Sequence, residues 1–156
     1  MNEQMDPQTR ALELRDAILG LRTELGKVVV GQREVIDALL AGLLADGHVL
    51  LEGAPGLGKT LLIKALGRAL GLEVSRIQFT PDLMPADIIG AQTLSEGPDG
   101  PSIAFSPGPV FTELLLADEI NRANPRTQSA LLEAMAERQV TAAGKTHLLS
   151  DPFFVL

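Results

Sequence analysis

Apolar residues recur every three or four positions in three stretches of the chain, which is the spacing of one face of a helix. The first predicted helix ends near Gly26, and its apolar face comprises Ala11, Leu14, Ile18, Leu21 and Leu25. Two more helices are predicted at residues 32–45 and 60–70. The fourth follows Asn124, a good N-cap residue with proline after it, and ends near Arg138.

Short apolar runs between these helices are typical of strands in a buried parallel sheet. They cover residues 48–51, 75–79, 111–117 and 153–156. The proline-rich segment 80–109 is predicted to be a short helix with an inserted hairpin, and two short segments, 139–141 and 146–149, to pair as a second hairpin. Strands that alternate with helices predict an α/β fold.

Composition excludes several classes of function. The 156 residues fit one compact domain, and 13 Lys and Arg against 20 Asp and Glu leave a net charge of -7, which argues against nucleic-acid binding. The chain has no cysteine, and its two histidines, His48 and His147, have no spaced ligand partners for a metal. Neither a signal peptide nor a membrane span is expected, so we predict a soluble, cytoplasmic protein.

One segment matches the phosphate-binding pattern G-x-x-x-x-G-K-[ST], whose backbone N–H groups surround phosphates at a helix N-terminus. The predicted nucleotide-binding residues of this loop are Gly53, Ala54, Pro55, Gly56, Leu57, Gly58, Lys59, Thr60 and Leu61. Lys59 is expected to reach the β and γ phosphates, and the Thr60 hydroxyl to ligate Mg²⁺. The alternative is a glycine turn that only joins a strand to a helix.

Two adjacent acids, Asp118 and Glu119, follow the apolar run 114–117, at the strand end where open parallel sheets bind ligands. We expect Asp118 to hold Mg²⁺ and Glu119 to deprotonate the water that attacks the γ-phosphate, so that Lys59, Asp118 and Glu119 are the predicted catalytic residues. An ordinary acidic loop is the alternative. Three arginines, Arg122, Arg126 and Arg138, are candidates for contact with phosphate or a neighbouring subunit, or are solvated charges on helices.

Several segments together resemble AAA+ ATPases of the MoxR family. They are residues 118–123, 128–133 and 137–141, with 76–85 and 29–32 ahead of them. The resemblance implies a P-loop NTPase fold of the three-layer αβα type, with a leading helix or linker at residues 1–27 and part of the nucleotide-binding core, including Walker A and Walker B, at 28–156. It also implies that Val29 and Val30 contact adenine, and that the hairpin near residues 97–105 is the helix 2 insert of this clade.

For the whole protein, the resemblance implies ATP and Mg²⁺ as cofactors, a homo-hexameric ring, chaperone-like remodelling of partners, and von Willebrand factor A domain proteins among those partners. Sensor 1, the arginine finger, the last core strand and the helical lid are expected beyond residue 156, so this chain alone should hydrolyse little or no ATP. Two alternatives stay open: a nucleotide-gated binding or assembly module with little turnover, and a magnesium-chelatase-like subunit. A nucleic-acid motor is disfavoured by the charge.

Overall fold

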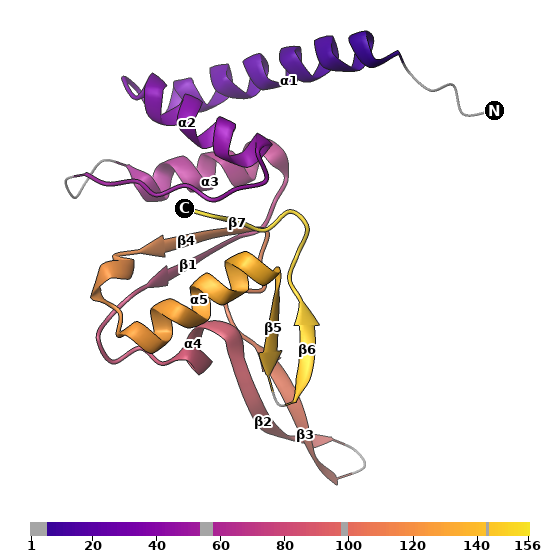
Figure 1. The fold of residues 1–156 in the computed structure, drawn as a ribbon, viewed down its shortest axis with the longest axis vertical. Helices are drawn as coiled ribbons and strands as arrows, with labels where there is room; N and C mark the ends of the chain where they lie inside the picture. Colours follow the sequence, from indigo (N-terminus) through magenta and orange to yellow (C-terminus); the bar gives the residue numbers. More distant parts are fainter. Residues whose placement is uncertain (1–5, 54–57, 98–99, 143) are drawn as a thin grey trace. The chain divides into compact units, whose positions relative to one another are not determined.

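The structure is a computed structural model that describes residues 6–53, 58–97, 100–142 and 144–156. The chain divides into two compact units, Met1–Gly71 and Leu72–Leu156, and we describe each unit by itself. Helices α1 to α3 belong to the first unit, and the remaining helices and all the strands belong to the second (Figure 1). The boundary expected between residues 27 and 28 stays a prediction.

The first unit is built from three helices, α1 (Pro7–Val28), α2 (Arg33–Leu44) and α3 (Lys59–Leu70). Helix α1 packs against both α2 and α3. An ion pair, in which Nε of Arg22 lies 2.6 Å from a carboxylate oxygen of Asp37, links α1 to α2. The buried apolar side chains of the three helices are Leu25, Ile36, Leu39, Leu40, Leu62, Ile63 and Leu66. All three predicted helices are therefore confirmed.

The prediction of a strand at residues 48–51 is wrong. The structure gives this segment no regular secondary structure, and Leu50 exposes 73% of its surface. A strand exists only where a neighbouring backbone supplies hydrogen bonds. The ladders among the described residues join other segments of the chain, all of them in the second unit. A short apolar run indicates burial but does not specify a pairing partner, and for this reason the strand prediction failed.

The second unit contains a sheet of three parallel strands in the order β1–β4–β7. Strand β1 (Val74–Gln78) pairs with β4 (Leu114–Asp118), and β7 (Phe154–Val155) pairs with the other edge of β4. Because β4 is central, its first three residues, all leucine, are almost completely buried. The strands predicted at 75–79, 111–117 and 153–156 are confirmed, although β4 begins at Leu114.

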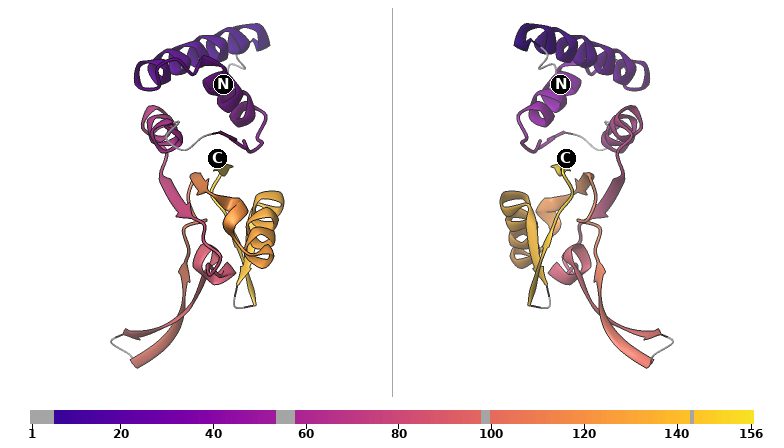
Figure 2. Two further views of the ribbon diagram at one scale, coloured as in Figure 1. Left: turned by 90° about the vertical axis from the view of Figure 1, so that its left-hand side faces the viewer. Right: turned by 90° about the vertical axis from the view of Figure 1, so that its right-hand side faces the viewer.

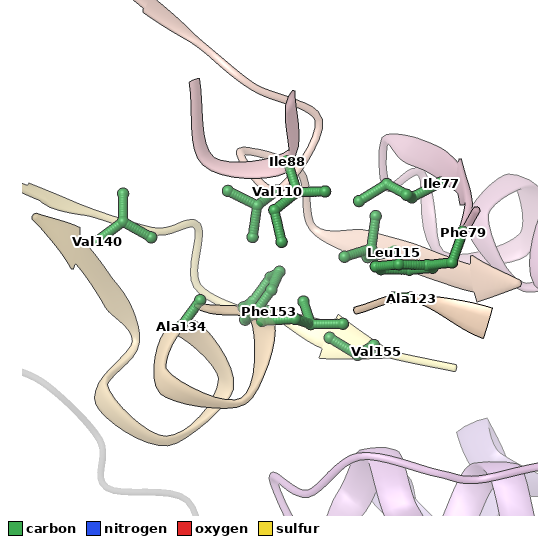
Figure 3. Close-up of a cluster of buried hydrophobic side chains, with 11 residues drawn as sticks. Ile77, Phe79, Ile88, Val110, Leu115, Ala123, Ala134, Val140, Phe153 and Val155 are labelled. Carbon is green, nitrogen blue, oxygen red and sulfur yellow. The ribbon is translucent and has the colours of Figure 1, made fainter. Parts of the chain in front are cut away.

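Helix α5 (Pro125–Glu137) covers this sheet and encloses its core. Figure 3 shows side chains from β1 (Ile77), β4 (Leu115), β7 (Val155) and α5 (Ala134) turned toward one cluster. The helix starts where the sequence predicts, since the Asn124 carboxamide oxygen accepts the backbone N–H of Thr127 at 3.0 Å. It ends at Glu137, and the C-cap residue Arg138 has a φ of 54°, in the left-handed region.

Two hairpins flank the sheet of the second unit. Helix α4 (Pro85–Ile89) leads into β2 (Gly90–Gly97) and β3 (Gly100–Pro107), and β5 (Gln139–Ala142) pairs with β6 (Lys145–Leu148). Figure 2 shows the β2–β3 hairpin extending away from the sheet. Gly90 starts it at a φ of 99°, where a Cβ atom would lie 2.3 Å from the carbonyl oxygen of Ser106. The short helix and both hairpins are thus confirmed.

The rings of Phe105 on β3 and His147 on β6 stack with centroids 4.1 Å apart, so the two hairpins contact one another. Across the described residues, no helix is both long and apolar enough to cross a membrane.

Candidate functional site

The predicted phosphate-binding residues lead into the first turn of α3. Gly58 is the N-cap residue at a φ of 72°, and Lys59 and Thr60 are the first two residues of the helix, both partly buried. The left-handed conformation suits glycine because it has no Cβ atom. Gly53 is exposed, Leu61 exposes 49% of its surface, and residues 54–57 of the loop, Ala54 to Leu57, lie outside the described residues.

The charge at this helix terminus favours an anion. The first turn of α3 contains no acidic residue, and the N-terminus of a helix carries a positive partial charge. The ion pairs of the described residues join other side chains, so Lys59 is without a carboxylate partner among them. A helix N-terminus whose lysine has no carboxylate partner among the described residues can bind a phosphate.

The predicted adenine residues lie at the corner between α1 and α2. Val29 is buried, with 5% of its surface exposed, and Val30 exposes 83%. A cavity of about 460 Å³ opens here. Its lining residues are Arg22, Thr23, Gly26, Lys27, Val29, Val30, Gly31, Arg33 and Ile36. The lining combines buried apolar residues, Val29 and Ile36, with basic ones, of which Arg22 and Lys27 are paired with Asp37 and Glu24. A partly apolar lining is compatible with a base.

Asp118 is the last residue of β4, at the carboxyl end of the sheet, and only 18% of its side chain is exposed. Its Oδ2 accepts a hydrogen bond from Nη2 of Arg76 at 2.7 Å. The same Nη2 also donates to Oε1 of Gln78 at 2.6 Å. Arg76 and Gln78 are two positions apart on β1, so their side chains lie on the same face of the strand. The register of β1 with β4 places Gln78 beside Asp118. A carboxylate this far from water needs a positive partner, and Arg76 supplies it.

Glu119 follows in a different backbone conformation. Its φ of 57° is uncommon for a residue with a Cβ atom, and it starts the 3-10 helix η1 (Ile120–Arg122). Nη1 of Arg122 donates to Oε2 of Glu119 at 2.8 Å, and about half of each side chain is exposed, 54% and 46%. Because solvent screens this pair, it contributes about 0–1 kcal/mol to stability. The turn therefore separates the surroundings of two acids that are adjacent in sequence.

The other two candidate arginines differ from each other. Arg126 is exposed on α5, whereas the half-buried Arg138 donates from Nη1 to the carbonyl oxygen of Phe153. Arg138 thus connects the end of α5 to the start of β7.

The donor set fits Mg²⁺ that arrives with a nucleotide. Mg²⁺ usually binds one or two carboxylates together with substrate phosphates and water. Asp118 offers one largely buried carboxylate, and within the described ranges no three His, Cys, Asp or Glu side chains gather to hold a metal by themselves. Asp118 is the residue of the second unit that would hold the ion, and the part expected of the Thr60 hydroxyl stays a prediction.

The structure groups the predicted residues by unit. Lys59 and Thr60 are neighbours in the first unit, and Asp118 and Glu119 are neighbours in the second. Sequence reasoning missed the contact of Arg76 with Asp118 and the contact of Gln78 with Arg76. The available signal was two long polar side chains, Arg76 and Gln78, at alternate positions of a predicted strand.

Comparison with known proteins identifies the family. Residues 48–156 match the model of the ATPase family associated with various cellular activities, AAA. The chain belongs to this AAA ATPase family. The match covers both the phosphate-loop residues and the acid pair, and it confirms the α/β P-loop fold class.

Relatives within the family include MoxR proteins. The chain is 48% identical to chaperone MoxR1 of Mycobacterium tuberculosis over 133 residues, which are 85% of this chain and 35% of the relative. It is 41% identical to protein MoxR of Methylorubrum extorquens over 139 residues, 85% and 39% of the two chains. The resemblance to MoxR-type AAA+ ATPases is therefore confirmed.

A solved structure also supports membership of this family. The crystal structure of a candidate ATPase from Cytophaga hutchinsonii superposes with a TM-score of 0.84 at 46% identity, and the match covers 96% of this chain and 44% of that one. The chain thus spans less than half the length of these AAA relatives.

Proposed function

We propose that the complete protein binds ATP with Mg²⁺ and hydrolyses it. One observation carries the proposal: α3 begins with a left-handed Gly58 followed directly by Lys59 and Thr60, and no carboxylate among the described residues neutralises that lysine. Backbone N–H groups of this turn would bind the phosphates, and Lys59 would contact the β and γ phosphates. The cavity beside Val29 and Val30 would receive adenine.

The acid pair supplies the remaining groups. Asp118 would hold Mg²⁺ together with Thr60, and the ion would neutralise charge that develops on the phosphates during transfer. Glu119, which is half exposed, would orient and deprotonate the attacking water. For this, its carboxylate has to leave Arg122 or share one oxygen with it.

Assembly and partners are proposed from the family relationship. A relative 48% identical to this chain is named a chaperone, and on this basis we propose a chaperone-like remodelling role. A homo-hexameric ring and a partner with a von Willebrand factor A domain complete the proposal. Size-exclusion chromatography with light scattering, in ATP and in its absence, tests the ring.

A nucleotide-gated binding module with little turnover is the second candidate function. The observation that favours it is the ion pair of Arg122 with Glu119, because a base with an engaged carboxylate oxygen is less available to water. In this case ATP binding alone would change assembly or partner affinity.

The substitution Glu119→Gln separates the two functions. We expect it to lower the rate of ATP hydrolysis about 10²- to 10⁴-fold and to leave nucleotide affinity within a few fold, because the amide accepts hydrogen bonds but cannot take the proton. Glu133→Gln, an equivalent change at an exposed position on α5, is the matched control. Hydrolysis and partner activation are measured together. If Glu119→Gln leaves the hydrolysis rate at the wild-type level, the assignment of the base is wrong; if hydrolysis falls and partner activation persists, the binding module is favoured.

A further inference from the structure

The proposed metal ligand already has a cationic partner in the second unit. Asp118 is fixed in the central strand of the sheet, where its backbone carbonyl accepts the N–H of Phe79 at 2.9 Å, and its carboxylate is paired with Arg76. The oxygen that Arg76 occupies, Oδ2, is one of only two on this side chain. Mg²⁺ would need to bind one of the same two oxygens at about 2.0–2.1 Å.

We propose that Arg76 neutralises Asp118 in the nucleotide-free protein and competes with Mg²⁺ for it, so that Arg76 sets the Mg²⁺ concentration required for nucleotide binding. This inference rests on the proposed function, in which Asp118 binds the metal. Arg76 is a positioning residue here because it acts through Asp118.

Electrostatics favours the competition. A divalent ion at Asp118 would lie within a few ångströms of the Arg76 guanidinium, and like charges at that distance repel strongly in a partly desolvated site. Without any cation, however, a carboxylate that is 18% exposed would bear an uncompensated charge. One positive partner at a time satisfies both conditions.

The structure also shows which partner can move. The Arg76 side chain is 49% exposed, and its second contact, Gln78, is itself exposed on the surface of β1. A guanidinium on a flexible stem can turn into water without leaving a buried charge behind. Asp118 lacks that freedom, because the β1–β4 ladder fixes its backbone on one side. Binding of the metal therefore displaces Arg76 and leaves the acid in place.

A Mg²⁺ titration tests the proposal. Binding of a fluorescent ADP analogue to the complete protein is measured against MgCl₂ concentration in the wild type, Arg76→Met and Arg10→Met. Methionine keeps the apolar stem and removes the charge, and Arg10→Met removes the same charge from an exposed position on α1. We expect Arg76→Met to lower the half-saturating Mg²⁺ concentration by roughly three- to tenfold, as loss of one charge-assisted hydrogen bond to a competitor implies. Arg10→Met should match the wild type.

Metal binding without nucleotide provides a second readout. In EDTA, Arg76→Met should melt at a lower temperature than the wild type, because Asp118 is left without a cation, and MgCl₂ alone should restore part of the difference. Adding Asp118→Asn to Arg76→Met removes the unpaired charge and should abolish that recovery. Should Arg76→Met fail to fold, Gln78→Leu replaces it: this change releases one hydrogen bond that holds the guanidinium and should lower the Mg²⁺ requirement by a smaller factor.

The outcomes separate the inference from the function on which it depends. A half-saturating Mg²⁺ concentration that is unchanged or higher in the Arg76 variant overturns the competition, since Arg76 would then be a structural ion pair or a support for the metal site. A wild-type protein that binds the nucleotide equally well in EDTA, or does not bind it at all, contradicts the proposed function itself.

Discussion

The start of α3 and the end of β4 differ in whether their charged side chains have a partner of opposite charge. At the start of α3, the first turn contains Lys59 and no acidic residue, and no carboxylate among the described residues pairs with this lysine. At the end of β4, both acids are already paired with arginines, Asp118 with Arg76 and Glu119 with Arg122. The first region therefore favours an anion, while each acid of the second region already has a cationic partner.

Lys59 and Asp118 are both partly buried, so this difference reflects the length and flexibility of the two side chains as well as their burial. The ammonium of Lys59 is at the end of a long flexible stem and is easily hydrated, whereas the carboxylate of Asp118 is short and sits in the sheet. Glu119 lies between these cases, since its pair with Arg122 is local and about half exposed. Nucleotide binding should consequently depend strongly on Lys59, and metal binding should depend on how Asp118 is paired.

Removing Lys59 tests the first half of the comparison and should have the largest effect on binding. We expect Lys59→Ala to weaken ATP affinity about 10- to 150-fold, which corresponds to the loss of hydrogen bonds between charged groups worth about 1.5–3 kcal/mol. Lys64→Ala, on the exposed face of the same helix, is the matched control and should bind ATP like the wild type. Equal affinities for the Lys59 variant and the control, measured by equilibrium fluorescence, would show that the phosphates bind elsewhere.

The smallest expected effect concerns a third acid at the same edge of the second unit. A hydrogen bond from the Thr80 side chain, followed by one from the backbone of Asp82 itself, holds the pKa of the fully exposed Asp82 carboxyl below its ordinary value of 3.8. Since the folded-state pKa is depressed, the associated stabilisation is present above pH 3.8 and is lost as the pH falls through the lower, folded-state pKa. Unlike Asp118, this acid is stabilised by neutral groups.

The substitution Thr80→Val should raise the pKa of Asp82 toward the ordinary value. NMR titration of the Asp82 carboxyl carbon measures the change directly. Thr93→Val, which removes a hydroxyl from the β2–β3 hairpin, is the control and should leave the Asp82 titration as it is in the wild type. A midpoint that does not move in Thr80→Val would mean that the threonine hydroxyl has no part in the depression.

Local patterns predicted the helices, hairpins and caps of this chain because their determinants are close in sequence. The Asn124 cap is an example, since it bonds to a residue three positions away. The strand expected at residues 48–51 failed because pairing needs a distant partner that periodicity does not reveal. The contact of Arg76 with Asp118 was not predicted for the same reason, because the two residues are 42 positions apart in the sequence.

The same contrast holds within the candidate site. Lys59 and Thr60 were found because the phosphate-loop pattern is contiguous, and Asp118 and Glu119 because they end an apolar strand. Neither the left-handed conformation of Glu119 nor its pairing with Arg122 follows from these patterns. Sequence thus supplied the candidate residues of the site, which stay predictions, and the structure added the charge partners of Asp118 and Glu119.

Calorimetric titration of ATP into the wild type and Asp118→Asn, each with and without Mg²⁺, tests the central claim most directly. We predict that Mg²⁺ tightens ATP binding to the wild type and that the gain is lost in Asp118→Asn, while affinity in EDTA is similar for both. An equal gain from Mg²⁺ in the two proteins would place the metal away from Asp118 and would contradict the account.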